Sequence, residues 1–208
     1  MKPIFITGIG TGIGKTVVSA IVATALDADY WKPVQAGTGV QTDSQWVSSI
    51  LSPEKVWDET YRLKMAASPH IAARDEGVSI NVERIQQQLS VKNKKVVIEG
   101  AGGLLVPLTD KLFIIDLIKR LDARVILVSR NYLGSINHSL LTAKVCADEK
   151  LDVVGWIFND QYLNYEEEIV NWTKLAKIAS IPRTQAVTQT FIKEQANRCR
   201  SHLLKVLC

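Results

Sequence analysis

A glycine-rich segment near the start of the chain carries residue types that suit the binding of a nucleoside triphosphate. It runs from Gly8 to Thr16 with the sequence GIGTGIGKT, after an apolar run and before a segment with helical spacing. Glycines let backbone N–H groups approach phosphate oxygens, and the N-terminus of a helix adds unpaired donors and partial positive charge. Lys15 is expected to reach the terminal phosphates, and the Thr16 hydroxyl to bind Mg²⁺. We therefore interpret this segment as a phosphate-binding loop.

The spacing of this loop differs by one residue from the commonest phosphate-loop motif. That motif has a glycine five residues before Gly14, where this chain has Ile9, and the glycine lies one position earlier, at Gly8. The dinucleotide fingerprint GxGxxG also fails, because its third glycine would fall on Ile13 or Lys15. The loop is therefore predicted to bind a triphosphate rather than a nicotinamide dinucleotide. The alternative is a flexible glycine turn without a ligand.

Charged residues follow two other apolar runs. Lys32 lies in KPVQAG, and Glu99 follows KVVI and opens EGAGG. Because ligands of open α/β sheets bind beyond the carboxyl ends of the strands, both side chains are expected near the phosphate loop. Lys32 either holds substrate and neutralises charge at the γ-phosphate or is a surface lysine. Glu99 and Asp43, in TDS, are candidate Mg²⁺ ligands, with a plain helix cap as the alternative for Asp43.

The pair Asn159-Asp160, after the apolar run GWIF, is a candidate for contacting the base of the nucleotide. An asparagine amide presents a donor and an acceptor that match the edge of adenine. The guanine-reading pattern NKxD is absent, because Gln161 and Tyr162 follow. This favours ATP over GTP, and the alternative for Asn159 is a turn residue after a strand.

The elements that must position these residues follow from the alternation of apolar runs and segments with helical periodicity. Strands are predicted over 3–7, 30–34, 95–99, 124–129 and 153–158. Helices are predicted over 15–26, 43–51 with Asp43 as its N-cap, 82–89, 113–121, 136–149, 166–178 and 192–206. Residues 52–80 are interpreted as loop with short helical pieces. The pattern predicts one α/β domain over residues 1–208, with a doubly wound, mostly parallel sheet like that of P-loop NTPases.

The composition is that of an ordinary globular protein. The chain has 208 residues, 47% of them hydrophobic and 22% charged, with a formal net charge of +4. This charge favours neither nucleic acid nor a membrane surface, so neither is expected as a partner. No stretch approaches the roughly 20 apolar residues of a membrane span. Three scattered cysteines, Cys146, Cys199 and Cys208, indicate reduced thiols, and the protein is expected to be cytoplasmic.

Taken together, these motifs resemble those of the dethiobiotin synthetase family. The segments GIGTGIGKT, KPVQAG, TDS, SPH, VIEGAGGLLVPL, LGSINHS and GWIFND have the order and spacing of that family, from residue 4 to about residue 185. The match includes the one-residue offset in the phosphate loop. The resemblance implies an ATP-dependent ligase of biotin synthesis that carboxylates 7,8-diaminononanoate (7,8-diaminopelargonate) with CO₂. It would close the cyclic urea through a carbamic-phosphoric anhydride and release ADP and phosphate.

The resemblance also implies a role for individual residues. Lys32, Lys15 and Thr11 would be catalytic, and Thr16, Asp43 and Glu99 would hold Mg²⁺. The expected ATP-binding residues are Gly12, Ile13, Gly14, Lys15, Thr16, Val17, Asp43, Glu99, Gly100, Ala101, Gly102, Asn159, Asp160 and Pro182. The expected substrate-binding residues are Lys32, Ala36, Thr38, Ser135, Ile136 and Asn137. In the family the amides at Ser135, Ile136 and Asn137 hold the substrate's tail carboxylate across a dimer interface, which implies a homodimer.

Two positions depart from the family pattern. Many members carry an acidic residue where this chain has Gly12, and a hydroxyl residue where it has Ala36, for which Thr38 is a candidate substitute. Two other readings of the sequence remain. One is an ATP-switched protein of the partitioning or septum-site type, although the signature lysine of that class is missing from Gly8-Ile9-Gly10. The other is a ligase that acts on a different diamine or amino acid.

Overall fold

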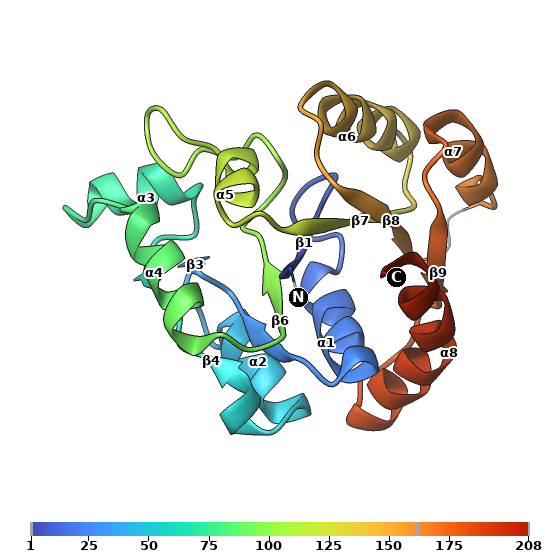
Figure 1. Ribbon diagram of the computed structural model, residues 1–208, viewed down its shortest axis with the longest axis horizontal. Helices are drawn as coiled ribbons and strands as arrows, with labels where there is room; N and C mark the ends of the chain where they lie inside the picture. Colours follow the sequence, from blue (N-terminus) through green and yellow to red (C-terminus); the bar gives the residue numbers. More distant parts are fainter. Residues whose placement is uncertain (1, 161–162, 208) are drawn as a thin grey trace.

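A seven-stranded parallel sheet forms the centre of the computed structural model, which describes residues 2–160 and 163–207 (Figure 1). The strand order is β4-β2-β6-β1-β7-β8-β9, and every pairing in it is parallel. The strands are β1 Ile4–Gly8, β2 Asp29–Trp31, β4 Val56–Trp57, β6 Val96–Glu99, β7 Arg124–Arg130, β8 Val153–Asn159 and β9 Lys177–Ile181. The chain crosses from one side of β1 to the other between β6 and β7. The carboxyl end of β1 is therefore the switch point where ligands of such sheets bind.

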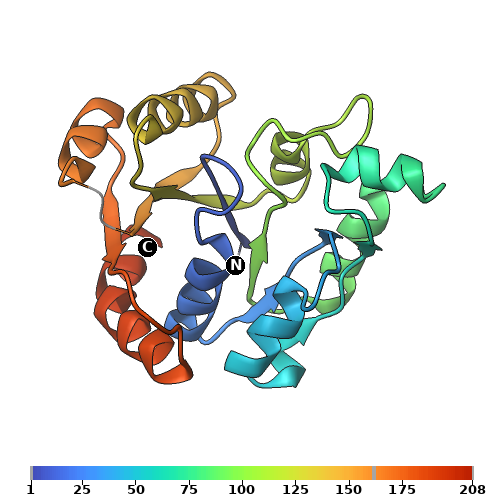
Figure 2. The ribbon, with the colours of Figure 1, turned by 180° about the vertical axis from the view of Figure 1, so that it is seen from behind.

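Helices cover both faces of this sheet, as the doubly wound prediction requires. In Figure 1, α1 (Lys15–Leu26), α2 (Asp43–Ile50) and α8 (Gln189–Leu207) lie below the strands, and α5 (Ile114–Arg120), α6 (Ser135–Asp148) and α7 (Glu166–Thr173) lie above them. Helix α4 (Val82–Lys92) packs on the same face as α5 to α7. The rear view in Figure 2 again shows α1 and α8 side by side.

The alternation of side chains along β1 explains why both faces are covered. Ile4 and Ile6 belong to the apolar cluster under α1 and α8, whereas Phe5 between them belongs to the cluster under α4 to α7. All three side chains are at most 2% exposed. Successive residues of a strand point to opposite faces, so a strand buried on both faces is apolar throughout. The prediction of an α/β fold with a mostly parallel, doubly wound sheet is confirmed.

The predicted strand over 30–34 is wrong as a single element. The chain forms β2 (Asp29–Trp31), breaks at Lys32 and Pro33, and forms β3 (Val34–Ala36) in a separate two-stranded parallel sheet with β5 (Tyr61–Leu63). Proline lacks the N–H that a central strand needs for its ladder, so the first sheet cannot continue through Pro33. As a result Lys32 lies in the break between two strands and not on a strand.

The prediction for residues 52–80 is correct for the helical pieces and for most of the loop, but it misses two short strands. The short helices are η1 (Pro53–Lys55) and α3 (Pro69–Asp75), but β4 and β5 also lie in this stretch. Both strands have only two or three residues, too few for an alternating pattern to be visible in the sequence. They are held by buried side chains, Trp57 in β4 and Leu63 in β5.

The end of α7 and the N-cap of α2 also differ from their predictions. Helix α7 ends at Thr173, because Lys174 adopts a left-handed conformation with φ of 57°, and the chain then enters β9, which pairs with β8. The predicted helix over 166–178 therefore runs past the end of α7 into the first two residues of the edge strand β9. At α2 the N-cap is Thr42, whose hydroxyl accepts from the Gln45 N–H, and Asp43 is the first helical residue. The carboxylate of Asp43 is thus available for another role.

The remaining sequence expectations concern thiols and membranes. Cys146 and Cys199 are buried and unpaired, and burial raises the pKa of their thiols to about 12 and about 11. Cys208 and the dipeptide at 161–162 lie outside the described residues. In the part of the chain that the structure describes, none of the helices has the length and apolar character needed to cross a membrane.

Candidate active site

The phosphate loop joins the carboxyl end of β1 to the first turn of α1. Gly14, the N-cap of α1, has φ of 87°, a conformation that residues with a Cβ rarely adopt. A Cβ at Gly14 would also lie 1.7 Å from Asn159 Nδ2. Asn159 in turn donates from Nδ2 to the Ile13 carbonyl at 3.0 Å. The end of β8 therefore braces the loop, and only glycine fits at this point.

Lys15 is buried at the start of α1. Its Nζ donates to the Gly10 carbonyl at 2.6 Å, so the ammonium lies over the loop itself. The pKa of Lys15 is lowered to about 8, mainly by burial. The charge of Lys32 also lowers this pKa, whereas the carboxylates of Glu99 and Asp43 raise it. An ammonium in this position lacks a full counter-charge and is suited to an anionic ligand such as a phosphate.

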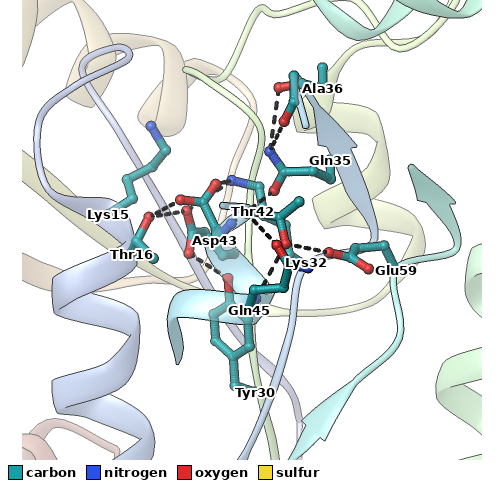
Figure 3. A network of polar contacts seen from close by, with 12 residues as sticks. Lys15, Thr16, Tyr30, Lys32, Gln35, Ala36, Thr42, Asp43, Gln45 and Glu59 are labelled. Atoms are coloured by element: carbon teal, nitrogen blue, oxygen red, sulfur yellow. Dashed lines mark hydrogen bonds and ion pairs between the residues drawn. The ribbon is translucent and has the colours of Figure 1, made fainter. Parts of the chain in front are cut away.

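Three oxygen ligands meet beside the loop, as Figure 3 shows for Thr16 and Asp43. Thr16 Oγ1 lies 2.8 Å from Asp43 Oδ1 and 2.9 Å from Glu99 Oε1. A hydroxyl has one hydrogen, so it cannot donate to both carboxylates at once. A cation among these oxygens resolves the conflict, since a hydroxyl and two carboxylates are ligands that Mg²⁺ accepts. No larger cluster of His, Cys, Asp or Glu suited to a metal occurs among residues 2–160 and 163–207. The donor set therefore fits Mg²⁺.

Lys32 lies against the same two carboxylates. Its Nζ is 3.1 Å from Glu99 Oε1 and forms an ion pair with Asp43 Oδ2 (Figure 3). Burial alone would lower the pKa of Lys32, but the attraction of Glu99 and Asp43 prevails and raises it. Burial likewise opposes ionisation of Asp43, yet Lys32 keeps the pKa of that carboxyl below its usual value. The site thus pairs the buried Lys32 ammonium with the buried carboxylate of Glu99 and the partly exposed carboxylate of Asp43.

A cavity of about 650 Å³ opens above this cluster. Many of the residues predicted to bind nucleotide, metal or substrate line it: Thr11, Gly12, Gly14, Lys15, Thr16, Val17, Lys32, Ala36, Asp43, Glu99, Ala101 and Gly102. Sequence reasoning assigned no role to Gln35, Val106 or the segment Ala66-Ala67-Ser68-Pro69, which also line it. The motif SPH begins at Ser68 and includes part of that segment, so it was the sequence signal that could have placed these residues at the site. The cavity brings the phosphate loop, Lys32 and the two carboxylates into one space.

A second, smaller cavity of about 190 Å³ adjoins the other side of the loop. Asn159, Asp160 and Pro182, the residues predicted to contact the base, line it together with Gly12, Gly14 and Val17. Arg130, at the end of β7, also lines this cavity and pairs with Asp160 at 3.1 Å. Nothing in the sequence marks Arg130, because a single arginine after a strand is common on protein surfaces.

Comparison with known proteins identifies the family. A family model described as an AAA domain matches residues 2–190. The ATP-dependent dethiobiotin synthetase BioD of Christiangramia forsetii is 42% identical over 208 residues, covering 99% of this chain and 99% of that protein. The chain belongs to the dethiobiotin synthetase family. The synthetase of Cytophaga hutchinsonii is 49% identical and that of Rhodopseudomonas palustris strain HaA2 43% identical, covering 82% and 90% of this chain and 82% and 88% of those proteins. Members of this family are ligases that act with ATP.

Similar solved structures come from another branch of the same fold. The MinC:MinD cell division complex of Aquifex aeolicus matches with a TM-score of 0.59 at 16% identity, covering 100% of this chain and 96% of that one. A ParA family ATPase from Chlorobium tepidum matches with a TM-score of 0.56 at 16% identity, covering 99% and 93%. These likenesses, at 16% identity, confirm the P-loop NTPase fold and carry no function, whereas the dethiobiotin synthetases are 42–49% identical to this chain.

Four residues with expected roles in dethiobiotin synthetases lie outside the larger cavity. Ser135, Ile136 and Asn137 form the first turn of α6, and none of them lines that cavity. The Ser135 N–H already donates to the Tyr132 carbonyl at 2.9 Å. Thr38 lies two residues after the end of β3, and its N–H donates to the Lys64 carbonyl at 3.3 Å.

Two other members of the expected nucleotide set act through their backbone. The Gly100 N–H donates to the Ile6 carbonyl at 2.9 Å, which holds the EGAGG turn against β1. Ile13 buries its side chain in the core while its carbonyl accepts from Asn159. Ile13 therefore supports the phosphate loop and Gly100 supports the EGAGG turn, and neither residue lines the larger cavity.

Proposed function

We propose that this chain makes dethiobiotin from 7,8-diaminononanoate, CO₂ and ATP, and releases ADP and phosphate. The observation that carries the proposal is the position of Lys32. Its ammonium lies against Asp43 and Glu99 in the lining of a cavity that the phosphate loop also lines. A nucleotide hydrolase needs no lysine there, whereas a reaction between an anionic carbamate and a γ-phosphate does.

The nucleotide would lie across the phosphate loop, with its phosphates in the larger cavity and its base in the smaller one. The backbone from Gly12 to Val17 and the Lys15 ammonium would bind the phosphates. Asn159 uses one amide hydrogen on Ile13 and keeps a second hydrogen and an acceptor oxygen that suit adenine. Pro182 and Asp160 would flank the base.

Thr16, Asp43 and Glu99 would hold Mg²⁺ together with phosphate oxygens. The ion supplies positive charge where negative charge gathers between the β- and γ-phosphates. Binding of the ion would loosen the contacts of Lys32, because Mg²⁺ and the Lys32 ammonium would share the carboxylates of Asp43 and Glu99. Lys32 is then directed toward the substrate side of the cavity.

The chemistry that this arrangement supports has three stages. An amine of the diamine captures CO₂ and loses a proton, which gives a carbamate. A carbamate oxygen attacks the γ-phosphorus and ADP leaves, with Lys32 and Lys15 neutralising the charge on the transferring group and Thr11 beside it. The second amine attacks the carbonyl carbon of the resulting carbamic-phosphoric anhydride, so that phosphate leaves and the cyclic urea closes. Phosphorylation is needed because it converts a poor oxygen leaving group into a good one.

We further propose a homodimer in which the first turn of α6 serves the partner's cavity. The N-terminus of a helix is suited to the tail carboxylate of the substrate. Leu105 and Leu141, 58% and 56% exposed, line an apolar groove of about 350 Å³ beside α6, and Leu133 is 88% exposed. Exposed leucines at such density support an interface at this face.

We also propose that residues 1–208 act as one ATP-binding domain in the cytoplasm. Unpaired Cys146 and Cys199 support a reducing compartment. Both apolar clusters pack on the same central sheet, which supports a single folding unit.

The test is product formation with each reactant left out in turn. With the diamine, bicarbonate, Mg²⁺ and ATP, we expect dethiobiotin by mass spectrometry and one ADP for each product molecule. Omission of any one of them should abolish both. A protein that binds ATP but forms no product from this diamine would contradict the proposal. If it formed a cyclic urea from another diamine instead, the second reading, a ligase of different substrate, would hold.

A further inference from the structure

A buried tyrosine contacts the candidate metal site from within the core. Tyr30 lies in the middle of β2, is 0% exposed, and belongs to the apolar cluster under α1. Its hydroxyl donates to Glu99 Oε2 at 2.8 Å. Figure 3 shows Tyr30 approaching the cluster of Thr16, Asp43 and Lys32 from the side of the core. The residue has no part in the roles described so far.

The two oxygens of Glu99 are used differently. Oε1 lies 2.9 Å from Thr16 Oγ1 and 3.1 Å from Lys32 Nζ, and so faces the other groups of the site. Oε2 accepts the tyrosine hydrogen bond and faces the core. The side chain of Glu99 is 1% exposed, so Oε2 has no access to solvent as an alternative partner. Tyr30 therefore fixes which oxygen the carboxylate offers.

This difference matters for the choice of cation. Mg²⁺ requires near-octahedral geometry, whereas Ca²⁺ takes six to eight ligands and readily accepts both oxygens of one carboxylate. The hydrogen bond from Tyr30 holds Oε2 toward the core, so the carboxylate presents Oε1 to a cation in the site. We propose that Tyr30 is a positioning residue that keeps Glu99 a one-oxygen ligand and thereby favours Mg²⁺ over Ca²⁺. The inference rests on the proposed metal site.

Without the phenol hydroxyl, Oε2 would be a buried acceptor without a donor. Such a group costs free energy, and the carboxylate lowers that cost by turning toward the nearest positive charge. In the variant that charge is the cation, so both oxygens of Glu99 turn toward it and a larger ion is accommodated. A phenylalanine fills the same apolar space, so the Tyr30→Phe change removes the donor and little else.

The experiment measures how Mg²⁺ and Ca²⁺ each raise the affinity for a non-hydrolysable ATP analogue, by titration calorimetry without diamine. The matched control is Tyr61→Phe, since the Tyr61 hydroxyl accepts from the Asn81 N–H at 2.9 Å, outside the site. We expect Mg²⁺ to enhance affinity more than Ca²⁺ in the wild type and in the control. In Tyr30→Phe the Mg²⁺ enhancement should fall by about tenfold, the lower end of effects seen when a ligand loses its outer partner, and the ratio of Mg²⁺ to Ca²⁺ should fall with it.

An unchanged ratio in a folded Tyr30→Phe variant would overturn the inference. A Tyr30→4-fluorophenylalanine variant fills the volume of the hydroxyl but has no hydrogen to donate. It should show the same fall in the Mg²⁺ to Ca²⁺ ratio as Tyr30→Phe. A wild-type ratio in this variant would mean that a cavity and not the lost hydrogen bond causes the change, which would also overturn the inference. If the wild type itself shows no response to Mg²⁺, the proposed metal site fails and not only the role of Tyr30.

Discussion

At the scale of single residues, Lys32 connects the two halves of the proposed reaction. It is a buried cation held by the buried carboxylate of Glu99 and the partly exposed carboxylate of Asp43, and the same carboxylates are the best candidates for the metal. Two cations cannot use the same oxygens fully, so binding of Mg²⁺ and release of Lys32 toward substrate are coupled. This coupling depends on Lys32, Asp43 and Glu99 meeting in one cavity, so it follows from no single sequence motif.

Replacement of Lys32 by alanine should separate catalysis from nucleotide binding. The Lys32→Ala variant should bind the ATP analogue with Mg²⁺ and lose about 10²–10³-fold in turnover, the usual cost of removing one preorganised charge from a transition state. Calorimetry and ADP release measure the two quantities. The control is Lys144→Ala, because Lys144 is 72% exposed on α6 and pairs with Asp148, away from the site. Wild-type turnover in Lys32→Ala would show that Lys32 has no catalytic role.

Nucleotide binding should take up a proton in mildly alkaline solution. Burial lowers the pKa of Lys15 to about 8, so the free protein is largely unprotonated there at about pH 9. Phosphates next to the amine raise its pKa again, and the bound form therefore gains close to one proton. Calorimetry in two buffers of different ionisation enthalpy measures this uptake. At about pH 7 the uptake should be small, since Lys15 is already protonated. No uptake at the higher pH would show that Lys15 does not contact the phosphates.

The sequence predicted the residues of the site whose chemistry is visible from type and spacing. Lys15 and Thr16 follow glycines, and Lys32 and Glu99 follow apolar runs, so parallel strands bring them to one edge. Tyr30 could not be predicted in the same way, because a tyrosine inside an apolar run has the pattern of a core residue. Its contact with Glu99 depends on the parallel pairing of β2 with β6, which no local pattern encodes.

At the scale of elements, the junction of β1 and α1 depends on the backbone of Gly14. The Gly14→Ala variant should lose about 1–2 kcal/mol of unfolding free energy from the left-handed conformation alone, and more from the contact with Asn159. Urea unfolding measures the loss. The control is Gly10→Ala in the same loop, where an added Cβ would meet no atom within 4 Å and where we expect a change below about 0.5 kcal/mol. Equal effects of the two substitutions would contradict this account of the loop.

Long elements were predicted well and short ones poorly, for a physical reason. Helix α1 and strands β7 and β8 have enough residues for a period to appear. Strand β4 has two residues and is held by contacts with β2 that lie far away in the sequence. The first two residues of strand β9 were taken for the end of a helix because no turn residue such as glycine or proline separates the two elements, although Lys174 leaves the helical conformation just before β9.

At the scale of the whole molecule, the proposed dimer should depend on the leucines beside α6. A Leu141→Asp variant should become monomeric by light scattering and lose activity, because the site would lack the partner's α6. The control, Leu204→Asp, changes a leucine 45% exposed on α8, on the other face of the sheet, and should stay dimeric. A monomeric and active wild type would contradict the shared site.

The fold class could be predicted from the sequence, whereas the effect of the two departures from the family pattern could not. Ala36 lines the larger cavity, so the missing hydroxyl there faces the substrate side. Gly12 has φ of 72° and open space around its would-be Cβ, so an acidic residue would fit only with backbone strain. Both consequences depend on the shape of the cavity.

Incorporation of isotopically labelled bicarbonate tests the central proposal most directly. Purified protein with the diamine, Mg²⁺ and ATP should place the label in the urea carbon of dethiobiotin, with one ADP and one phosphate formed for each labelled product, and Lys32→Ala should show almost none. Consumption of ATP without labelled urea, at concentrations where nucleotide and diamine both bind, would contradict the proposed reaction.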